Sequence, residues 1–178
     1  MTLDATVTHR RLVLGNQDSE TGWYKKAYMP SQGCGKSWKI AKSLLHKEIS
    51  KAEFIQKEIS LLDEEIDYAF TLLNKPWDLF VFYTKVIDSV GHFLAWDTKS
   101  MWHLYERVDN FVKELTKRVG SNTFILVISD HGMKRTGIHS DHAFYSTNVR
   151  LNLTNPKMTD FYNIIAEKLG TNENTYAR

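Results

Sequence analysis

The side chains of this sequence that are best suited to chemistry are two aspartate–histidine pairs. Asp88 and His92 are four residues apart, so a helical turn would place both on one face. Asp130 and His131 are adjacent and follow the apolar run ILVIS. A carboxylate oxygen together with an imidazole nitrogen suits Zn²⁺, Mn²⁺ or Fe²⁺. The two pairs therefore predict a site for a divalent metal ion.

Further candidate ligands follow His131 within eleven residues. His139 and His142 could each reach back to the first pair as a third ligand, and their spacing leaves the choice open. Asp141 lies between them, as a solvated acid or as a hydrogen-bond partner of a ligand. The single cysteine, Cys34, excludes an internal disulfide and an all-cysteine metal site. Any metal ion must therefore be held by nitrogen and oxygen atoms.

The elements that must position these groups read as a strand, a helix and a second strand. Residues 77–86 (WDLFVFYTKV) and 123–130 (TFILVISD) have the continuous apolarity of strands covered on both faces. Between them, residues 98–120 show helical periodicity. Two such strands are expected to be parallel, with a right-handed crossover, and ligands gather at the carboxyl ends of such strands. Asp88 and Asp130 lie at those ends, so the two pairs should share one site.

Other predicted elements flank this unit. Ser50 and Glu53 have the spacing of a capping box, which predicts the start of a helix that ends before Pro76. A small β-hairpin is expected within the first 30 residues, and residues 143–153 and 155–170 predict a last strand and helix. The inward stripes of the two long helices are expected at Phe54, Ile55, Ile59, Leu62, Ile66, Ala69, Phe70 and Leu73, and at Trp102, Tyr105, Val108, Val112, Leu115 and Val119.

Three motifs, DSVGH at 88–92, ISDHGM at 128–133 and GIHS at 137–140, resemble the metal-binding signature of the alkaline phosphatase superfamily. The nearest branch is the type I phosphodiesterase/nucleotide pyrophosphatase family, in particular its archaeal-type members. The resemblance covers roughly residues 75–165. It implies a three-layer α/β/α sandwich with a mostly parallel sheet.

The same resemblance implies two divalent metal ions, with Zn²⁺ favoured and Mn²⁺ second. The ligands that it implies are Asp88, His92 and His139 for the first ion, and Asp130 and His131 for the second. His142 is the alternative to His139, and Asp141 receives no family role. The implied reaction is hydrolysis of a phosphodiester or a nucleotide pyrophosphate through a Thr or Ser nucleophile.

Complete members of the family begin with a strand that ends in a metal-binding aspartate, and the nucleophile follows. The 87 residues before Asp88 contain no such pattern. We therefore expect residues 46–178 to be the C-terminal part of an incomplete hydrolase domain, and residues 1–45 to be an irregular or small β attachment and linker. Whether the chain is itself an enzyme stays open. Its expected partners are a phosphodiester or nucleotide-like small molecule, and a missing N-terminal half or an oligomer mate.

Two other classes of function remain open from the sequence. The chain could keep its metal site as a structural element of an assembly, without catalysis. Alternatively, PSQGCGKS at 30–37 resembles the phosphate-binding loop of nucleotide-binding proteins. Pro30 occupies the position of the first required glycine, and no apolar strand leads into the loop. A nucleotide-binding function is therefore the weaker of these two hypotheses.

The composition further limits the classes of protein to which this chain could belong. The chain is 42% hydrophobic and 25% charged, which is typical of a globular protein rather than a disordered one. A formal net charge of +2 is too small to indicate a nucleic-acid-binding surface. The sequence shows neither a signal peptide nor an apolar run of the roughly 20 residues that span a bilayer. We therefore expect a cytoplasmic protein with no membrane partner.

Overall fold

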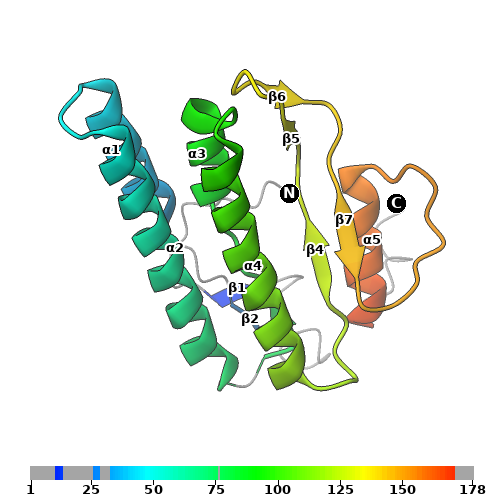
Figure 1. Cartoon of the computed structure of the whole chain (residues 1–178). Coiled ribbons are helices and arrows are strands. Elements are labelled where there is room, and N and C mark those ends of the chain that lie inside the picture. Colours follow the sequence, from blue (N-terminus) through cyan, green and yellow to red (C-terminus); the bar gives the residue numbers. More distant parts are fainter. Residues whose placement is uncertain (1–10, 14–25, 29–32, 76, 171–178) are drawn as a thin grey trace.

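The computed structural model of this 178-residue chain describes residues 11–13, 26–28, 33–75 and 77–170. Four helices lie side by side, and a pair of strands lies between them and a fifth helix (Figure 1). The helices are α1 (Gly33–Leu45), α2 (Lys51–Leu73), α3 (Val86–Leu94), α4 (Thr98–Val119) and α5 (Met158–Lys168). No helix in this described part is long and apolar enough to cross a membrane.

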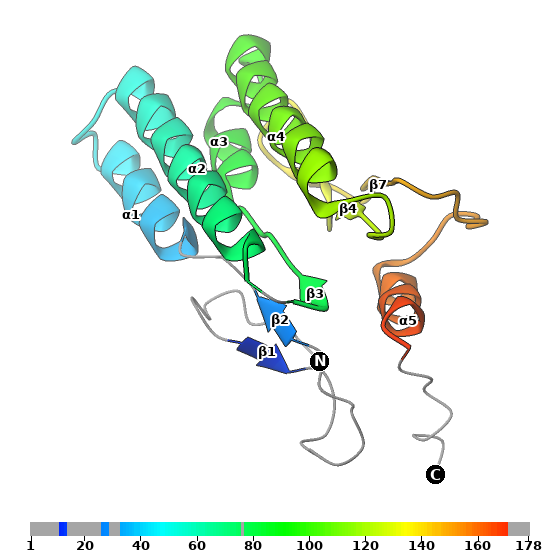
Figure 2. The ribbon, with the colours of Figure 1, turned by 90° about the horizontal axis from the view of Figure 1, so that it is seen from below.

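The strands are short and form three small sheets. They are β1 (Arg11–Val13), β2 (Lys26–Tyr28), β3 (Leu79–Phe80), β4 (Leu126–Ile128), β5 (Gly132–Met133), β6 (His139–Ser140) and β7 (Tyr145–Thr147). The pairs β1–β2, β4–β7 and β5–β6 are antiparallel, whereas β2 and β3 pair in parallel. The described chain is therefore mixed α/β and mostly helical, and the β1–β2–β3 sheet lies at one end of the helices (Figure 2).

The mostly parallel sheet of the predicted sandwich is not formed by the described residues. The predicted strand 77–86 is reduced to β3, because the backbone after Phe80 has no ladder partner there and Val86 already begins α3. β4 pairs with β7 in the antiparallel sense instead of lying parallel to β3. Continuous apolarity predicted strands covered on both faces, but β3 and β4 are only partly buried and Ile128 is 40% exposed. The neighbour of each strand depends on residues far apart in the chain.

Helix α2 begins with the predicted capping box. The Ser50 hydroxyl accepts a hydrogen bond from the Glu53 backbone N–H at 3.2 Å. In return, the Glu53 carboxylate accepts hydrogen bonds from the Ser50 backbone N–H and from the Ser50 hydroxyl, each at 2.8 Å, and these two bonds lower the pKa of Glu53. Two otherwise unpaired amide groups of the first turn are thereby satisfied.

Replacing Ser50 with alanine is expected to lower the free energy of unfolding by about 1 kcal/mol, because one of these amide groups loses its acceptor. Chemical denaturation measures the change. Ser60→Ala is the matched control, since Ser60 is an exposed interior residue of the same helix and alanine is the better helix former there. Equal losses in the two variants would contradict a capping role for Ser50.

The core lies between helices α1 to α4. It consists of Ala41, Phe54, Leu61, Leu62, Val86, Val90, Leu94 and Leu104. The stripe predicted for α4 is wrong at two positions, because Trp102 and Tyr105 are 69% and 45% exposed, whereas Leu104 and Phe111 are buried. The predicted stripe and the buried residues both recur at helical spacing, so periodicity alone does not distinguish them. The ring of Phe111 packs against Phe82 at 4.5 Å between centroids. Packing with α3 and its neighbours therefore selected the rotation of this helix.

Within the first 45 residues, the structure describes two short strands and one helix. The antiparallel pairing of β1 with β2 agrees with the expected β attachment, and the predicted turn at residues 15–18 lies outside the described residues. Gly33–Leu45, in contrast, is helical and packs against α2 and α3. The domain boundary at residue 45 stays a prediction, but α1 contributes Ala41 to the shared core.

Candidate metal centre

Two of the predicted ligands lie on helix α3. Asp88 is in its first turn, where the partial positive charge of the helix N-terminus favours a carboxylate, and His92 is in its last turn. Their four-residue spacing places both on one face, as predicted, and Asp88 Oδ1 is 3.3 Å from His92 Nε2. Val86, Val90 and Leu94 bury the opposite face of α3 in the core.

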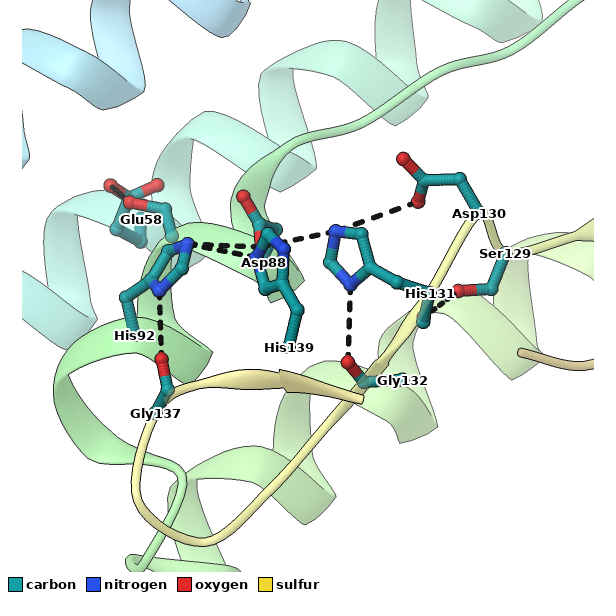
Figure 3. Close-up of polar contacts among 10 residues, drawn as sticks. Glu58, Asp88, His92, Ser129, Asp130, His131, Gly132, Gly137 and His139 are labelled. Atoms are coloured by element: carbon teal, nitrogen blue, oxygen red, sulfur yellow. Dashed lines mark hydrogen bonds and ion pairs between the residues drawn. The ribbon is translucent and has the colours of Figure 1, made fainter. Parts of the chain in front are cut away.

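The β5–β6 hairpin brings a third side chain to the same point. In its turn, Gly137 N–H donates to Lys134 O and Lys134 N–H donates to Ile138 O, each at 2.9 Å. The hairpin pairs His139 with Met133. His139 Nε2 lies 3.0 Å from Asp88 Oδ1 and 3.1 Å from His92 Nε2. Figure 3 shows the imidazoles of His92 and His139 turned toward the Asp88 carboxylate.

The spacing of these three atoms fits a divalent ion. A tetrahedral zinc ion with bonds of about 2.0–2.1 Å holds its ligand atoms about 3.3–3.4 Å apart. The three separations here are 3.0, 3.1 and 3.3 Å, so shifts of a few tenths of an ångström suffice. Asp88, His92 and His139 are also the group in the described residues whose potential ligand atoms converge. Nitrogen and oxygen donors of this kind suit Zn²⁺ and Mn²⁺.

A backbone carbonyl orients one of these ligands. His92 Nδ1 lies 2.9 Å from Gly137 O, which can only accept a hydrogen bond. His92 Nδ1 therefore carries the proton, and the lone pair of Nε2 faces Asp88 and His139. Metal-binding histidines in proteins are usually held in this way by a second acceptor.

The second predicted pair lies beside this group but is less compact. His131 Nε2 is 3.6 Å from Asp88 Oδ1 and 3.7 Å from Asp130 Oδ1, and the ring of His131 stacks on that of His139 at 3.5 Å between centroids. The Asp130 side chain is 76% exposed. His131 thus joins the cluster, whereas Asp130 stands at its rim (Figure 3).

The structure separates the remaining candidates from the cluster. His142 and Asp141 are exposed, and neither belongs to the converging group of ligand atoms. The spacing left open whether His139 or His142 is the third ligand, and the convergence of ligand atoms favours His139. The backbone carbonyl of His142, in contrast, approaches Gly132 closely.

Two motif glycines are required by close backbone approach. A Cβ at Gly132 would lie 2.5 Å from His142 O and from Ser140 Oγ. A Cβ at Gly137 would lie only 2.3 Å from His92 O. Gly137 also has a φ of +77°, a backbone conformation that residues other than glycine rarely adopt. Gly137 therefore allows the hairpin turn to lie against α3, and Gly132 allows β5 to lie close to Ser140 and His142.

Replacing Gly137 with alanine is expected to lower both the stability of the chain and its Zn²⁺ affinity, because the new methyl group displaces the hairpin from His92. Gly170→Ala is the matched control, since Gly170 also has a positive φ (+70°) but nothing lies within 4 Å of its Cβ position. Both variants should lose about 1–2 kcal/mol to backbone strain. Only Gly137→Ala should add a loss of metal affinity, measured by competition with a chromophoric chelator.

The candidate phosphate-binding loop does not have the geometry of one in its described part. Helix α1 already begins at Gly33, so residues 33–37 are helical and do not form the open part of a glycine-rich loop. Lys36 forms an ion pair with Glu64 at 2.8 Å, and the buried Ser37 hydroxyl donates to Glu58 at 2.9 Å. The lysine and serine that would bind phosphate are thus both engaged by α2, while residues 30–32 lie outside the described residues.

Two buried acids on α2 were missed by the sequence prediction. Glu58 and Glu65 are 0% and 5% exposed. Burial raises the pKa of each carboxyl to about 7, partly offset by hydroxyl groups, which are Ser37 and Ser89 at Glu58 and Thr84 at Glu65. Both acids fall in line with the apolar stripe of the helix, and that alignment is the signal that could have identified them.

Comparison with known proteins identifies the family. The model of the type I phosphodiesterase / nucleotide pyrophosphatase family matches residues 5–167. This chain belongs to that family. Members of it use metal ions, and the converging group Asp88, His92 and His139 lies within the matched residues. The family resemblance expected from the three motifs is thus confirmed, whereas the archaeal-type branch stays a prediction.

Curated relatives of this phosphodiesterase-family chain are transferases by name. GPI ethanolamine phosphate transferase 3 of Eremothecium gossypii is 37% identical over 73 residues, which is 38% of this chain and 7% of that protein. GPI ethanolamine phosphate transferase 2 of Debaryomyces hansenii is 31% identical over 87 residues, 48% of this chain and 10% of that protein. GPI ethanolamine phosphate transferase 3 of Saccharomyces cerevisiae is 29% identical over 105 residues, which is 54% of this chain and 10% of that protein.

The chain thus spans a tenth or less of the length of these three relatives. No solved structure matches it.

Proposed function

We propose that this chain carries the metal-binding part of a phosphodiester-processing centre, in which Asp88, His92 and His139 bind one divalent ion. The observation that supports this most is the triangle of Asp88 Oδ1, His92 Nε2 and His139 Nε2, with edges of 3.0–3.3 Å. Zn²⁺ is the first candidate and Mn²⁺ the second. Asp130 and His131 would hold a second ion, as the family resemblance implies.

The roles of the residues follow from their surroundings. Asp88 supplies the negative charge of the first site, and His92 is held in its binding tautomer by Gly137 O. His131 lies within 3.7 Å of both Asp88 and Asp130, so it links the two parts of the cluster. When bound, such ions polarise a phosphoryl oxygen and stabilise the charge of an in-line displacement.

For the substrate class, we favour ethanolamine phosphate diesters over nucleotide pyrophosphates. The support comes from the names of the relatives, which are GPI ethanolamine phosphate transferases. The reaction would break one ester bond of the diester, transfer the phosphoethanolamine group to a hydroxyl acceptor or to water, and release the other alcohol.

A specific alternative is a metal-binding element that contributes to an assembly without catalysis. It is favoured by the geometry, because the ligand atoms of Asp88, His92 and His139 converge on one point, whereas the Asp130 side chain of the second site is 76% exposed. Under both readings the metal ions bind the same residues. Turnover therefore separates the two readings, and metal binding tests what they share.

The test uses the metal-free chain, titrated with Zn²⁺ and Mn²⁺, and assayed with bis(p-nitrophenyl) phosphate and with the p-nitrophenyl diester of phosphoethanolamine. Saturable binding that is lost in Asp88→Asn supports the metal site. Turnover that is lost in the same variant supports catalysis, and faster turnover of the ethanolamine diester supports the substrate class. Binding without turnover favours the assembly element. Unchanged binding in Asp88→Asn would overturn the proposal.

A further inference from the structure

Three of the buried polar side chains in the described residues form one connected group beneath the candidate metal centre. Ser37 on α1, Glu58 on α2 and Ser89 on α3 are each at most 5% exposed. Both serine hydroxyls donate to the same atom, Glu58 Oε1, at 2.9 Å from Ser37 and 3.0 Å from Ser89. One carboxylate oxygen therefore joins three consecutive helices.

This arrangement is costly for stability. Glu58 is fully buried among apolar residues that include Phe54, Leu62 and Val86. Its second oxygen, Oε2, has no hydrogen-bond partner among the described residues. A leucine at this position would pack without either cost, since burying an unpaired polar group is unfavourable. What the glutamate adds is direction, because the hydrogen bond from Ser89 specifies how α3 is rotated and placed against α2, and the bond from Ser37 does the same for α1.

The rotation of α3 matters because of where Ser89 lies. It directly follows Asp88, so fixing Ser89 toward the core turns Asp88 toward His139. The rest of the inward face of α3 is apolar, and apolar contacts alone are not directional. In addition, Lys85 provides no side-chain cap to the first turn of α3. Figure 3 shows Glu58 beside the turn of α3 that carries Asp88.

We propose that Glu58 is a positioning residue for the metal centre: through Ser89 it holds α3 in the rotation that aims Asp88 and His92 at His139. The inference rests on the proposed metal-binding function. It assigns Glu58 no contact with metal or substrate, and its action passes through the Ser89 hydrogen bond. Metal ligands need their positions held within about 0.5 Å. Loss of a group that hydrogen-bonds directly to a ligand lowers affinity by about 10–100-fold, and the lower end of that range is expected for a residue that acts one bond further away.

Ser37 and Ser89 provide a matched pair of variants for the test. Ser89→Ala removes the link from Glu58 to α3, whereas Ser37→Ala removes the link from the same oxygen to α1. Both delete one hydroxyl at a site that is at most 5% exposed, so their costs in stability should be similar. Glu58→Gln is the conservative variant, because its amide oxygen can still accept from Ser89.

The measurement is the Zn²⁺ affinity of the full chain, with the absorption spectrum of bound Co²⁺ as a report on ligand geometry. Ser89→Ala should weaken Zn²⁺ binding about tenfold and change the Co²⁺ spectrum. Ser37→Ala and Glu58→Gln should both stay close to the parent chain. Equal affinities in Ser89→Ala and Ser37→Ala would overturn the proposal, even if both variants are less stable.

A second readout does not depend on metal binding. In the metal-free chain, the ring ¹⁵N–¹H signals of His92 and His139 should shift in Ser89→Ala and remain in place in Ser37→Ala. Unshifted rings in Ser89→Ala overturn the positioning role. Failure of the parent chain to bind Zn²⁺ overturns the proposed function and this role with it. Binding that is lost in His92→Ala but unchanged in Ser89→Ala overturns the positioning role alone.

Discussion

Replacing His139 with alanine is expected to lower the Zn²⁺ affinity of the chain by more than about 100-fold, because a direct ligand contributes more than the outer partners, whose loss costs about 10–100-fold. His139 Nε2 is within 3.1 Å of the potential ligand atoms of both Asp88 and His92. Competition against a chromophoric chelator measures the change, and the Co²⁺ spectrum of the variant reports the lost nitrogen ligand.

His142→Ala is the control for this experiment. His142 is also an exposed histidine of the same segment, three residues further along the chain, but it lies outside the converging group. The Zn²⁺ affinity of the His142→Ala variant should therefore match that of the parent chain. A larger loss in His142→Ala than in His139→Ala would show that the family motif had been assigned to the wrong histidine.

A second large effect is expected in the pH dependence of stability of the metal-free chain. The pKa values of Glu58 and Glu65 are raised from 4.5 to about 7, chiefly because burial disfavours the charged form. Between pH 4.5 and 7 the unfolded chain releases these protons while the folded chain retains them. The folded state then binds more protons, so its stability falls as pH rises through this window. Each carboxyl contributes a loss of up to about 3 kcal/mol by pH 8.

Glu65→Gln isolates this effect, because glutamine fills similar space without a charge. The variant should be close to the parent chain at pH 5 and more stable than it at pH 8, as measured by urea unfolding in the presence of a chelator. Glu64→Gln is the control, since Glu64 is exposed on the same helix and pairs with Lys36 at the surface. A difference between Glu65→Gln and the parent chain that does not change with pH would contradict the raised pKa.

Some features of this protein follow from interactions within a few residues, and these could be predicted from the sequence. The capping box at Ser50 and Glu53 depends on two bonds inside one helical turn. The common face of Asp88 and His92 depends on helical geometry alone, once α3 forms. The family is similarly contained in the motifs, which carry the ligand types and the glycines that permit close approach.

Other features depend on segments that meet only after folding. Trp102 and Leu104 both belong to helical patterns of α4, and contact with α3 and its neighbours determined that Leu104 is buried. The partner of β4 is β7 rather than the predicted parallel neighbour, because strand pairing joins backbone groups that no local pattern specifies.

The candidate centre shows both kinds of information at once. The residue types and spacing of the motifs identified Asp88, His92 and a third histidine, since metal chemistry restricts the ligands to a few side chains. The turn at Gly137 places His139 opposite Met133 and against α3, which separates it from His142. The burial of Glu58 under Asp88 likewise arises where three helices meet. Local pattern thus specified the chemistry, and long-range packing specified which side chains converge, because distances across helices and hairpins are not encoded in sequence spacing.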